Sequence, residues 1–420
     1  MFRVVETREA LERLGAAAAA VGRDLSFMEV CGTHTVSAFR SGLHSLMPRN
    51  VRLLSGPGCP VCVTSQRDID LLIAAATVPG VTVCTYGDML RVTGSRGTLE
   101  QARGRGATVR VIYSALDAVR LAATEPTRQV VFVAVGFETT APATAVAILE
   151  AERLGLQNFT VLASHKRVLP AMTALLEAGH VRVDGFLCPG HVAIIVGGEA
   201  FRPIVDNFGM PCVIAGFEDL HIAAGVAKLA EMVCDDRADL ANLYPQAVTA
   251  EGNAHAMELI ARVFDWTDAA WRGIGMLPRS GMVMRPAFSA FDAQARFGLV
   301  AADVPEPPGC LCGEVITGRA TPHDCKLFGK ACTPTRAIGP CMVSSEGTCQ
   351  AWFKYHRAPA AGAPATGAGP VPTLAAPDLG VAGLSLPKAN AGHAQGAAGR
   401  SPRRAAARNG TARRKERTGR

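Results

Sequence analysis

The sequence lacks the long apolar segments of a membrane protein. No stretch of about eighteen or more apolar residues runs without a polar interruption, although hydrophobic residues make up 49% of the chain. The opening residues MFRVVETREALERLG also lack the basic, apolar and small-residue order of a secretory signal. We therefore expect no membrane segment and a cytoplasmic location. Thirteen cysteines in a reducing compartment favour metal ligation or redox chemistry over a disulfide framework.

Two common nucleotide-binding motifs are also absent. The chain contains neither a G-x-x-x-x-G-K-[ST] loop nor a G-x-G-x-x-G turn, so the sequence gives nucleotide hydrolysis no support. The length of 420 residues is enough for roughly two to four domains with buried cores.

The net charge of +7 is concentrated at one end of the chain. Residues 358–420 contain ten Lys/Arg and two Asp/Glu, which leaves the other residues at −1. This segment is rich in Ala, Gly and Pro and poor in aromatic and branched residues, so we expect a disordered, solvated tail. Binding of its arginine cluster to nucleic acid or to an anionic surface is the less favoured alternative.

Short apolar runs alternate with helix-like stretches over the first 220 residues. Such alternation is typical of an α/β fold with parallel sheets and right-handed crossovers. Helix-forming residues precede Gly22, which we expect to end the first helix. We expect strands at 25–30, 51–56, 81–88, 108–113, 130–137, 159–165, 185–190 and 211–217, and helices at 7–21, 68–78, 115–125, 141–155 and 169–179.

Similar motifs recur in the two halves of this region. MEVCGTHT leaves a strand for a polar turn much as VAVGFETTAP does, and LLSGPGCPVC parallels GFLCPGHVAIIVG. We therefore predict two similar parallel-sheet lobes. Beyond about Leu220 the pattern becomes helical, at 220–236 and 251–266, and from Pro305 it becomes rich in loops and cysteine.

The last segment carries the strongest chemical signal. Thiolates on irregular, glycine-rich loops suit soft metals, namely zinc or an iron–sulfur cluster. Zinc sites commonly use two CxxC knuckles, and this segment has none. A [4Fe–4S] cluster with two spare thiols fits better, and merely buried small residues are the minor alternative. The six cysteines are Cys310, Cys312, Cys325, Cys332, Cys341 and Cys349.

A second set of thiols lies near the start of the chain. Cys59 and Cys62 form a CxxC that we expect at the opening of a helix, where dithiol exchange or soft-metal binding is favoured. Cys31 ends a predicted strand in the polar motif CGTHT, with His34 close behind it, where open α/β sheets place their ligand crevice. The alternative for Cys31 is an ordinary core thiol. We expect the other cysteines, Cys84, Cys188, Cys212 and Cys234, to be packed thiols.

Two further titratable residues follow predicted strands. Glu138 lies in GFETT and His191 in PGH, and both could line the same crevice. The alternative is a helix-capping role for the threonines beside Glu138 and an incidental His191.

Taken together, MEVCGTHT, GPGCPVC, GFETTAP, PGHVAIIVG and CKLFGKACTP…GPCMVSSEGTCQAW resemble the HypD family of [NiFe]-hydrogenase maturation factors. The resemblance runs from about residue 7 to Tyr355, and the tail beyond Arg357 falls outside it. It implies an iron–sulfur scaffold on which the Fe(CN)2CO group is assembled, together with the chaperone HypC and the cyanide donor HypE.

The resemblance also implies roles for individual cysteines. Cys31 would hold the transient iron together with a cysteine of HypC, and Cys59 and Cys62 would serve as a redox-active or iron-binding pair. Cys312 and Cys341 would form a dithiol beside the cluster, as in ferredoxin–thioredoxin reductase. The cluster ligands would be Cys310, Cys325, Cys332 and Cys349, although spacing alone allows other choices.

These considerations predict five units along the chain. They are an N-terminal helix at 1–22 packing on the iron–sulfur domain, α/β lobes at 23–120 and 121–220, a helical [4Fe–4S] domain at 221–357 and the basic tail at 358–420. The expected function is redox-active scaffolding of metal assembly, with electrons passing from the cluster through a dithiol relay. The alternatives are a stand-alone thiol–disulfide oxidoreductase and a purely structural scaffold.

Overall fold

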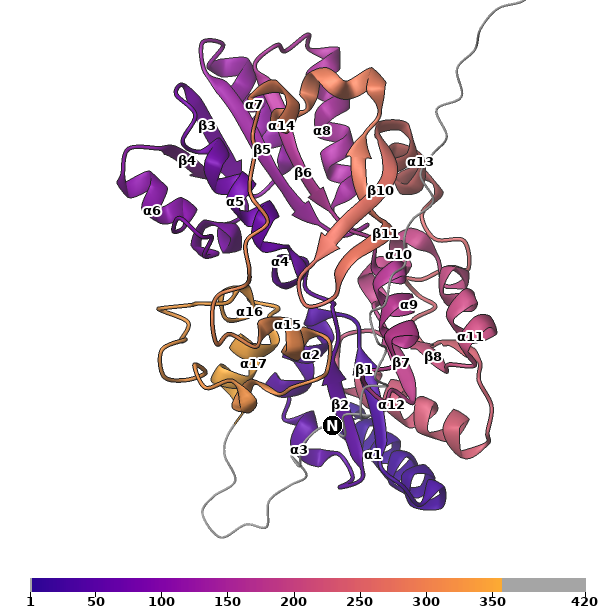
Figure 1. Cartoon of the computed structure of the whole chain (residues 1–420). Helices are drawn as coiled ribbons and strands as arrows, with labels where there is room; N and C mark the ends of the chain where they lie inside the picture. Colours follow the sequence, from indigo (N-terminus) through magenta and orange to yellow (C-terminus); the bar gives the residue numbers. More distant parts are fainter. Residues whose placement is uncertain (1, 357–420) are drawn as a thin grey trace, which may run out of the picture. The chain divides into compact units, whose positions relative to one another are not determined.

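The computed structural model describes residues 2–356 (Figure 1). Parallel sheets alternate with helices, which confirms the predicted α/β class. The predicted disordered basic tail at 358–420 lies outside the described residues. Within them, no helix is both long and apolar enough to cross a lipid bilayer.

The first sheet has five strands, all parallel. Its central strands are buried on both faces, which explains why they read as continuous apolar runs in the sequence. Residues Leu25–Glu29 pair on one side with Val51–Ser55 and on the other with Gly185–Leu187. In spatial order the strands are β2 (Val51–Ser55), β1 (Leu25–Glu29), β7 (Gly185–Cys188), β8 (Cys212–Ile214) and β9 (Leu240–Asn242).

The second parallel sheet has four strands. All eight predicted strands are present in the two sheets, but they are divided differently from the predicted boundary at residue 120. The chain leaves the first sheet after β2, builds the whole second sheet and returns for β7. Strand pairing is non-local, so local motifs do not tell which sheet a strand joins. The order is β4 (Thr108–Val111), β3 (Val81–Thr85), β5 (Gln129–Gly136) and β6 (Phe159–His165).

An antiparallel hairpin interrupts the region predicted to be helical. The predicted helix at 251–266 is confirmed only as α13 (Ala254–Val263), after which β10 (Phe264–Trp271) and β11 (Gly275–Met284) begin the hairpin. Strand β11 contacts β6 and α9 (Val168–Ala178). The range 221–357 is therefore not purely helical, and its hairpin packs on β6 of the second sheet and on α9.

The N-terminal helix α1 (Phe2–Val21) begins earlier than predicted and ends, as predicted, at Gly22, whose φ of +67° favours glycine. Its buried face includes Leu14 and packs on α12 (Asp219–Cys234) and on one face of the first sheet. The helix was predicted to pack on the domain at 221–357, and α12 lies almost entirely in that range. The core cluster of α1 contains α12 but, among the described residues, no part of the cysteine-rich segment.

The cysteine-rich segment has only short helices joined by loops. It packs against α2 and α4 (Figure 1). It contains α15 (Cys312–Ile316), η4 (Pro322–Asp324), α16 (Pro340–Val343) and α17 (Thr348–Tyr355). The remaining helices are α2 (Gly32–Arg40), α3 (Leu43–Leu46), α4 (Pro60–Val63), α5 (Gln66–Ala75), η1 (Gly87–Arg91), α6 (Leu99–Gly104), α7 (Ala115–Thr124), α8 (Ala141–Arg153), α10 (Gly190–Val196), η2 (Glu199–Phe201), α11 (Arg202–Phe208), η3 (Pro286–Phe291) and α14 (Ala293–Arg296).

Candidate functional site

All six cysteines of the C-terminal segment line one small cavity. Five of them are buried and Cys310 is half-buried. The backbone amide of Ile338 donates to Cys332 Sγ at 3.3 Å. Gly339 lies so close to Cys310 that an added Cβ would be 2.6 Å from its Sγ. The glycine-rich loops therefore let the backbone approach the sulfurs.

The donor set of this cavity fits a cluster better than a single ion. In the described part of the chain, no three Cys, His, Asp or Glu side chains are arranged to hold one metal ion. In a [4Fe–4S] cluster each thiolate binds a different iron, so the sulfurs surround a volume and do not converge on one point. Six soft donors around a shielded cavity satisfy that requirement, whereas a structural zinc ion needs four converging ligands.

Two of the six thiols form a pair. Cys312 and Cys341 are hydrogen-bonded through their sulfurs, and this contact, followed by burial, raises the pKa of Cys312 well above its ordinary value. Cys341 Sγ also accepts the backbone amide of Cys349 at 3.2 Å. Cys341 therefore contacts both Cys312, its expected dithiol partner, and Cys349, an expected cluster ligand.

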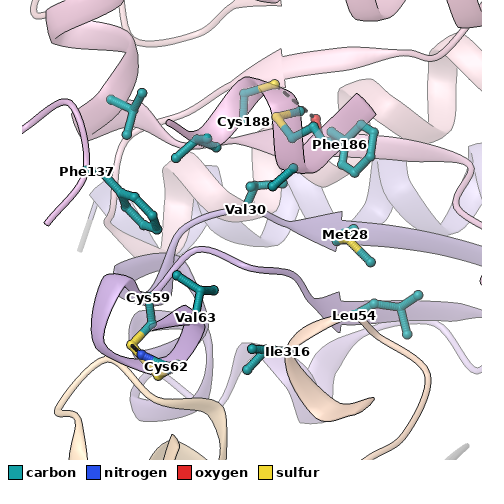
Figure 2. Close-up of a cluster of buried hydrophobic side chains, with 14 of the residues drawn as sticks. Met28, Val30, Leu54, Cys59, Cys62, Val63, Phe137, Phe186, Cys188 and Ile316 are labelled. Carbon is teal, nitrogen blue, oxygen red and sulfur yellow. Dashed lines mark hydrogen bonds between the residues drawn. A yellow bond between two sulfur atoms is a disulfide. The ribbon is translucent and has the colours of Figure 1, made fainter. Parts of the chain in front are cut away.

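The CxxC motif opens a helix, as predicted. Cys59 is the N-cap of α4, and its sulfur accepts the backbone amide of Cys62 at 3.2 Å. The two cysteines form a disulfide, which lies in the main core beside Val63 and Ile316 (Figure 2). Helix α4 contacts both α15 and α16, which carry Cys312 and Cys341. The structure therefore places the CxxC helix directly against the helices of the thiol pair.

Cys31 lies at the junction of β1 and α2, also as predicted. It is the N-cap of α2 and is only 6% exposed. The GPGC loop covers it, because Gly32 donates its amide to Gly58 O at 3.1 Å. A Cβ at Gly58 would collide with the backbone of Cys31 and Val30. Gly58 is therefore required for the loop to lie over the Cys31 backbone.

Replacing Gly58 with alanine should destabilise this junction. The new methyl group meets backbone atoms, which cannot rotate away, and overpacking of this kind costs about 1–3 kcal/mol. The measurement is chemical denaturation. Gly15→Ala is the matched control, because its Cβ would meet nothing within 4 Å in the interior of α1, and helix propensity predicts a gain of about 0.5–1 kcal/mol. Equal stabilities of the two variants would contradict the close approach at Gly58.

A carboxylate from the C-terminal segment lies beside Cys31. Thr33 Oγ1 donates to Glu346 Oε1 at 2.9 Å, and Gly32 lies against the same side chain. Burial, followed by the charge of Glu346, raises the pKa of Cys31 to about 12. Sequence reasoning missed Glu346. The available signal was its place in the polar loop SSEG between Cys341 and Cys349.

His34 and His191 meet around one aromatic ring. His34 is buried and 4.9 Å from the Phe217 ring, and the exposed His191 stacks on Phe217 at 3.8 Å. His34 Nε2 lies 3.0 Å from Gly216 O and 3.2 Å from Ala215 O, so it carries the hydrogen. Its Nδ1 is buried without a hydrogen-bond partner in the described residues. Burial lowers the pKa of His34 to about 4, which keeps the ring neutral with a free Nδ1 lone pair.

Glu138 occupies a different environment. The amide of Val168 donates to Glu138 Oε1 at 3.1 Å, so the carboxylate lies at the N-terminus of α9. Burial raises its pKa to about 7. The neighbouring Phe137 belongs to the core cluster that contains the CxxC disulfide (Figure 2). The recorded contacts of Glu138 therefore join it to α9, while its strand borders the thiol site.

The Glu138 carboxylate should make stability depend on pH. Its pKa is raised from 4.5 to about 7 in the folded state, so between these values the folded chain binds the proton more strongly and stability falls as pH rises. Glu138→Gln removes this loss. The free energy of unfolding of the variant minus that of the unmodified chain should therefore rise by ~3 kcal/mol from pH 4.5 to 7. Denaturation at both pH values tests this, with the exposed Glu150→Gln as the control. A pH-independent difference for Glu138→Gln would contradict the buried acid.

Three of the four cysteines predicted to be packed thiols are buried. Cys84, Cys188 and Cys212 are fully buried, and Cys188 donates to Phe186 O in the core (Figure 2). Cys234 is exposed, so the prediction is wrong for this residue. It lies at the C-terminal end of α12, where the helix meets solvent.

These features define an α/β protein with a buried thiol site suited to metal and redox chemistry. The family model HypD, described as the hydrogenase formation hypA family, matches residues 6–356. The chain is 46% identical over 363 residues to the hydrogenase maturation factor HypD of Azotobacter vinelandii, which covers 85% of this chain and 96% of that protein. It is 44% identical over 336 residues to HypD of Escherichia coli K12, covering 80% and 90% respectively. The chain belongs to the HypD family of hydrogenase maturation factors.

Proposed function

We propose that this chain assembles the Fe(CN)2CO group of [NiFe]-hydrogenase with HypC and HypE, in the cytoplasm. The observation that carries the proposal is the position of α4. Its N-cap residue Cys59 follows the loop over Cys31, and the helix itself contacts α15 and α16 of the cysteine-lined cavity. The proposed iron-binding thiol, Cys31, is thus covered by the loop that leads into the disulfide helix, and that helix contacts both helices that carry the Cys312 and Cys341 thiols.

Cys31 is the residue we propose as the iron anchor, with the iron as cargo. At neutral pH its thiol is protonated, because burial raises its pKa to about 12. Iron binding must therefore displace this proton. Glu346 is the adjacent carboxylate, and burial raises its pKa too, which makes it the candidate acceptor. The free Nδ1 of His34 and the exposed ring of His191 border the same strand ends.

We propose that the C-terminal cavity holds the [4Fe–4S] cluster through Cys310, Cys325, Cys332 and Cys349. When bound, the cluster would supply single electrons. The chain's own thiols do the rest of the relay. Cys312 and Cys341 exchange with the Cys59–Cys62 disulfide, which becomes a dithiol as the pair is oxidised. The buried setting keeps water and external thiols from these sulfurs.

Complementation tests this proposal. The chain, expressed in a strain that lacks its own HypD protein, should restore hydrogenase activity, and the Cys59→Ala/Cys62→Ala variant should not. The competing oxidoreductase hypothesis predicts that the purified chain reduces unrelated protein disulfides through the same pair without restoring the hydrogenase. A purely structural scaffold predicts restored activity in the double variant.

A further inference from the structure

The tip of the β10–β11 hairpin contacts both α4, which follows Cys59, and α15, which begins at Cys312. Arg272 donates its backbone amide to Val63 O at 2.9 Å, at the last residue of α4. The next residue, Gly273, is in backbone contact with Gly313 in α15, where a Cβ on Gly313 would lie 2.7 Å from Gly273 Cα. One short turn therefore touches both thiol-bearing helices.

The guanidinium of Arg272 strengthens this connection. Its side chain is completely buried. Nε donates to Thr64 O at 3.2 Å and Nη2 donates to Gln66 Oε1 at 3.1 Å. Both acceptors lie just beyond α4, so together with the backbone amide three donors of one residue hold the end of the CxxC helix. A planar fork with several fixed donors is a property of arginine that lysine lacks.

The same residue is tied to the segment before α15, where the neighbouring Gly273 donates its backbone amide to Glu306 Oε1 at 3.2 Å. Nη1 lies 3.4 Å from Glu306 Oε2 but has no hydrogen-bond partner within the described residues. Burying a cation costs several kcal/mol unless it is well paired. The ion pair with Glu306 therefore compensates the buried guanidinium and ties the hairpin turn to the segment that leads into α15.

We propose that Arg272 is a positioning residue for thiol–disulfide exchange between the Cys312/Cys341 pair and the Cys59–Cys62 disulfide. The inference rests on the relay in the proposed function. In the exchange, a Cys312 sulfur forms a bond to one sulfur of the disulfide and the other sulfur leaves as a thiol. Cys341 then attacks the mixed disulfide, so that two thiols and one disulfide are present before and after. Arg272 holds the two helices in register for the first attack.

A trapped mixed disulfide tests this role. In a Cys341→Ala parent, Cys312 attacks the disulfide but the second step is blocked, and the product is measured by acid quenching, alkylation and peptide mass spectrometry. Adding Arg272→Gln should slow trapping by roughly 10²-fold, the scale of effect that small misplacements of reacting groups produce. Arg272→Lys keeps the charge but not the fork and should be slowed by roughly tenfold. Arg167→Gln is the control, because Arg167 binds the same hairpin at Arg279 O and should leave the rate unchanged.

A second readout separates positioning from general loosening. Direct reduction of the buried Cys59–Cys62 disulfide by a small phosphine does not use Cys312 and needs the core around it to open, so it should be no slower with Gln at position 272 than with Arg272. Equal slowing by both routes, or normal trapping in Arg272→Gln, would overturn the proposal. If Arg272→Gln does not fold, normal trapping in Arg272→Lys would overturn it as well. No trapping in the Cys341→Ala parent would refute exchange between these segments, whereas complementation would still decide the maturation role separately.

Discussion

The Cys325→Ala variant should lose nearly all of its iron and acid-labile sulfide, while Cys312→Ala should keep both. Cys325 is one of the four expected ligands around the C-terminal cavity. Removing a thiolate ligand should lower the affinity for iron by more than the roughly 10–100-fold that is lost when a residue hydrogen-bonded to a ligand is changed. The segment has only short helices of its own, so its stability should fall with the cluster. Cys332→Ala should behave in the same way.

Cys312→Ala and Cys341→Ala provide the contrast. Their thiols contact each other, and we expect them to take part in exchange without holding iron. These variants should keep full iron and sulfide content after anaerobic purification but fail to restore hydrogenase activity. If Cys312→Ala loses iron as completely as Cys325→Ala, the ligand assignment is wrong and Cys312 replaces Cys310 in the set.

The second large effect is expected at Cys31. Cys31→Ala should reduce hydrogenase maturation in a complemented strain to background, because no other thiol occupies the end of β1. The cluster should stay intact, since Cys31 belongs to the first sheet and not to the cysteine-lined cavity. Loss of one buried sulfur atom should lower the free energy of unfolding by only about 1 kcal/mol.

The absorbance of the purified variant and the hydrogenase activity of the complemented strain check this prediction. The absorbance of the cluster at about 400 nm should match that of the unmodified chain. Cys234→Ala is the matched control, because Cys234 is exposed and far from the site in sequence; it should support normal maturation. Retained activity in Cys31→Ala would exclude Cys31 as the iron anchor.

Much of the local structure could be predicted from the sequence. Strands buried on both faces read as continuous apolar runs, and all eight predicted strands are present. The placement of Cys31 at a strand end and of Cys59 at a helix N-terminus followed from the same patterns, because each motif interrupts an apolar run with a polar or proline-containing turn. The positions of site residues that lie within one local motif could therefore be predicted from the sequence alone.

Features that depend on non-local contacts could not be predicted. The division of strands between the sheets depends on pairing across more than a hundred residues, as between β1 and β7. Glu346 approaches Cys31 from a segment more than three hundred residues away. Arg272 reads as an ordinary charged residue in the sequence, and only the hairpin buries it between two thiol helices. Glu138 was a candidate for lining the crevice, and its hydrogen bond to α9 could not be read from the GFETT motif.

The central claim is that iron carrying cyanide and carbon monoxide is built on Cys31. The most direct test is the infrared spectrum of the full chain purified anaerobically with HypC, from cells that also contain HypE. We predict absorption bands of iron-bound cyanide and carbon monoxide that are absent from the Cys31→Ala complex. A complex with HypC that has full cluster content but no such bands, or bands that persist in Cys31→Ala, would contradict the account.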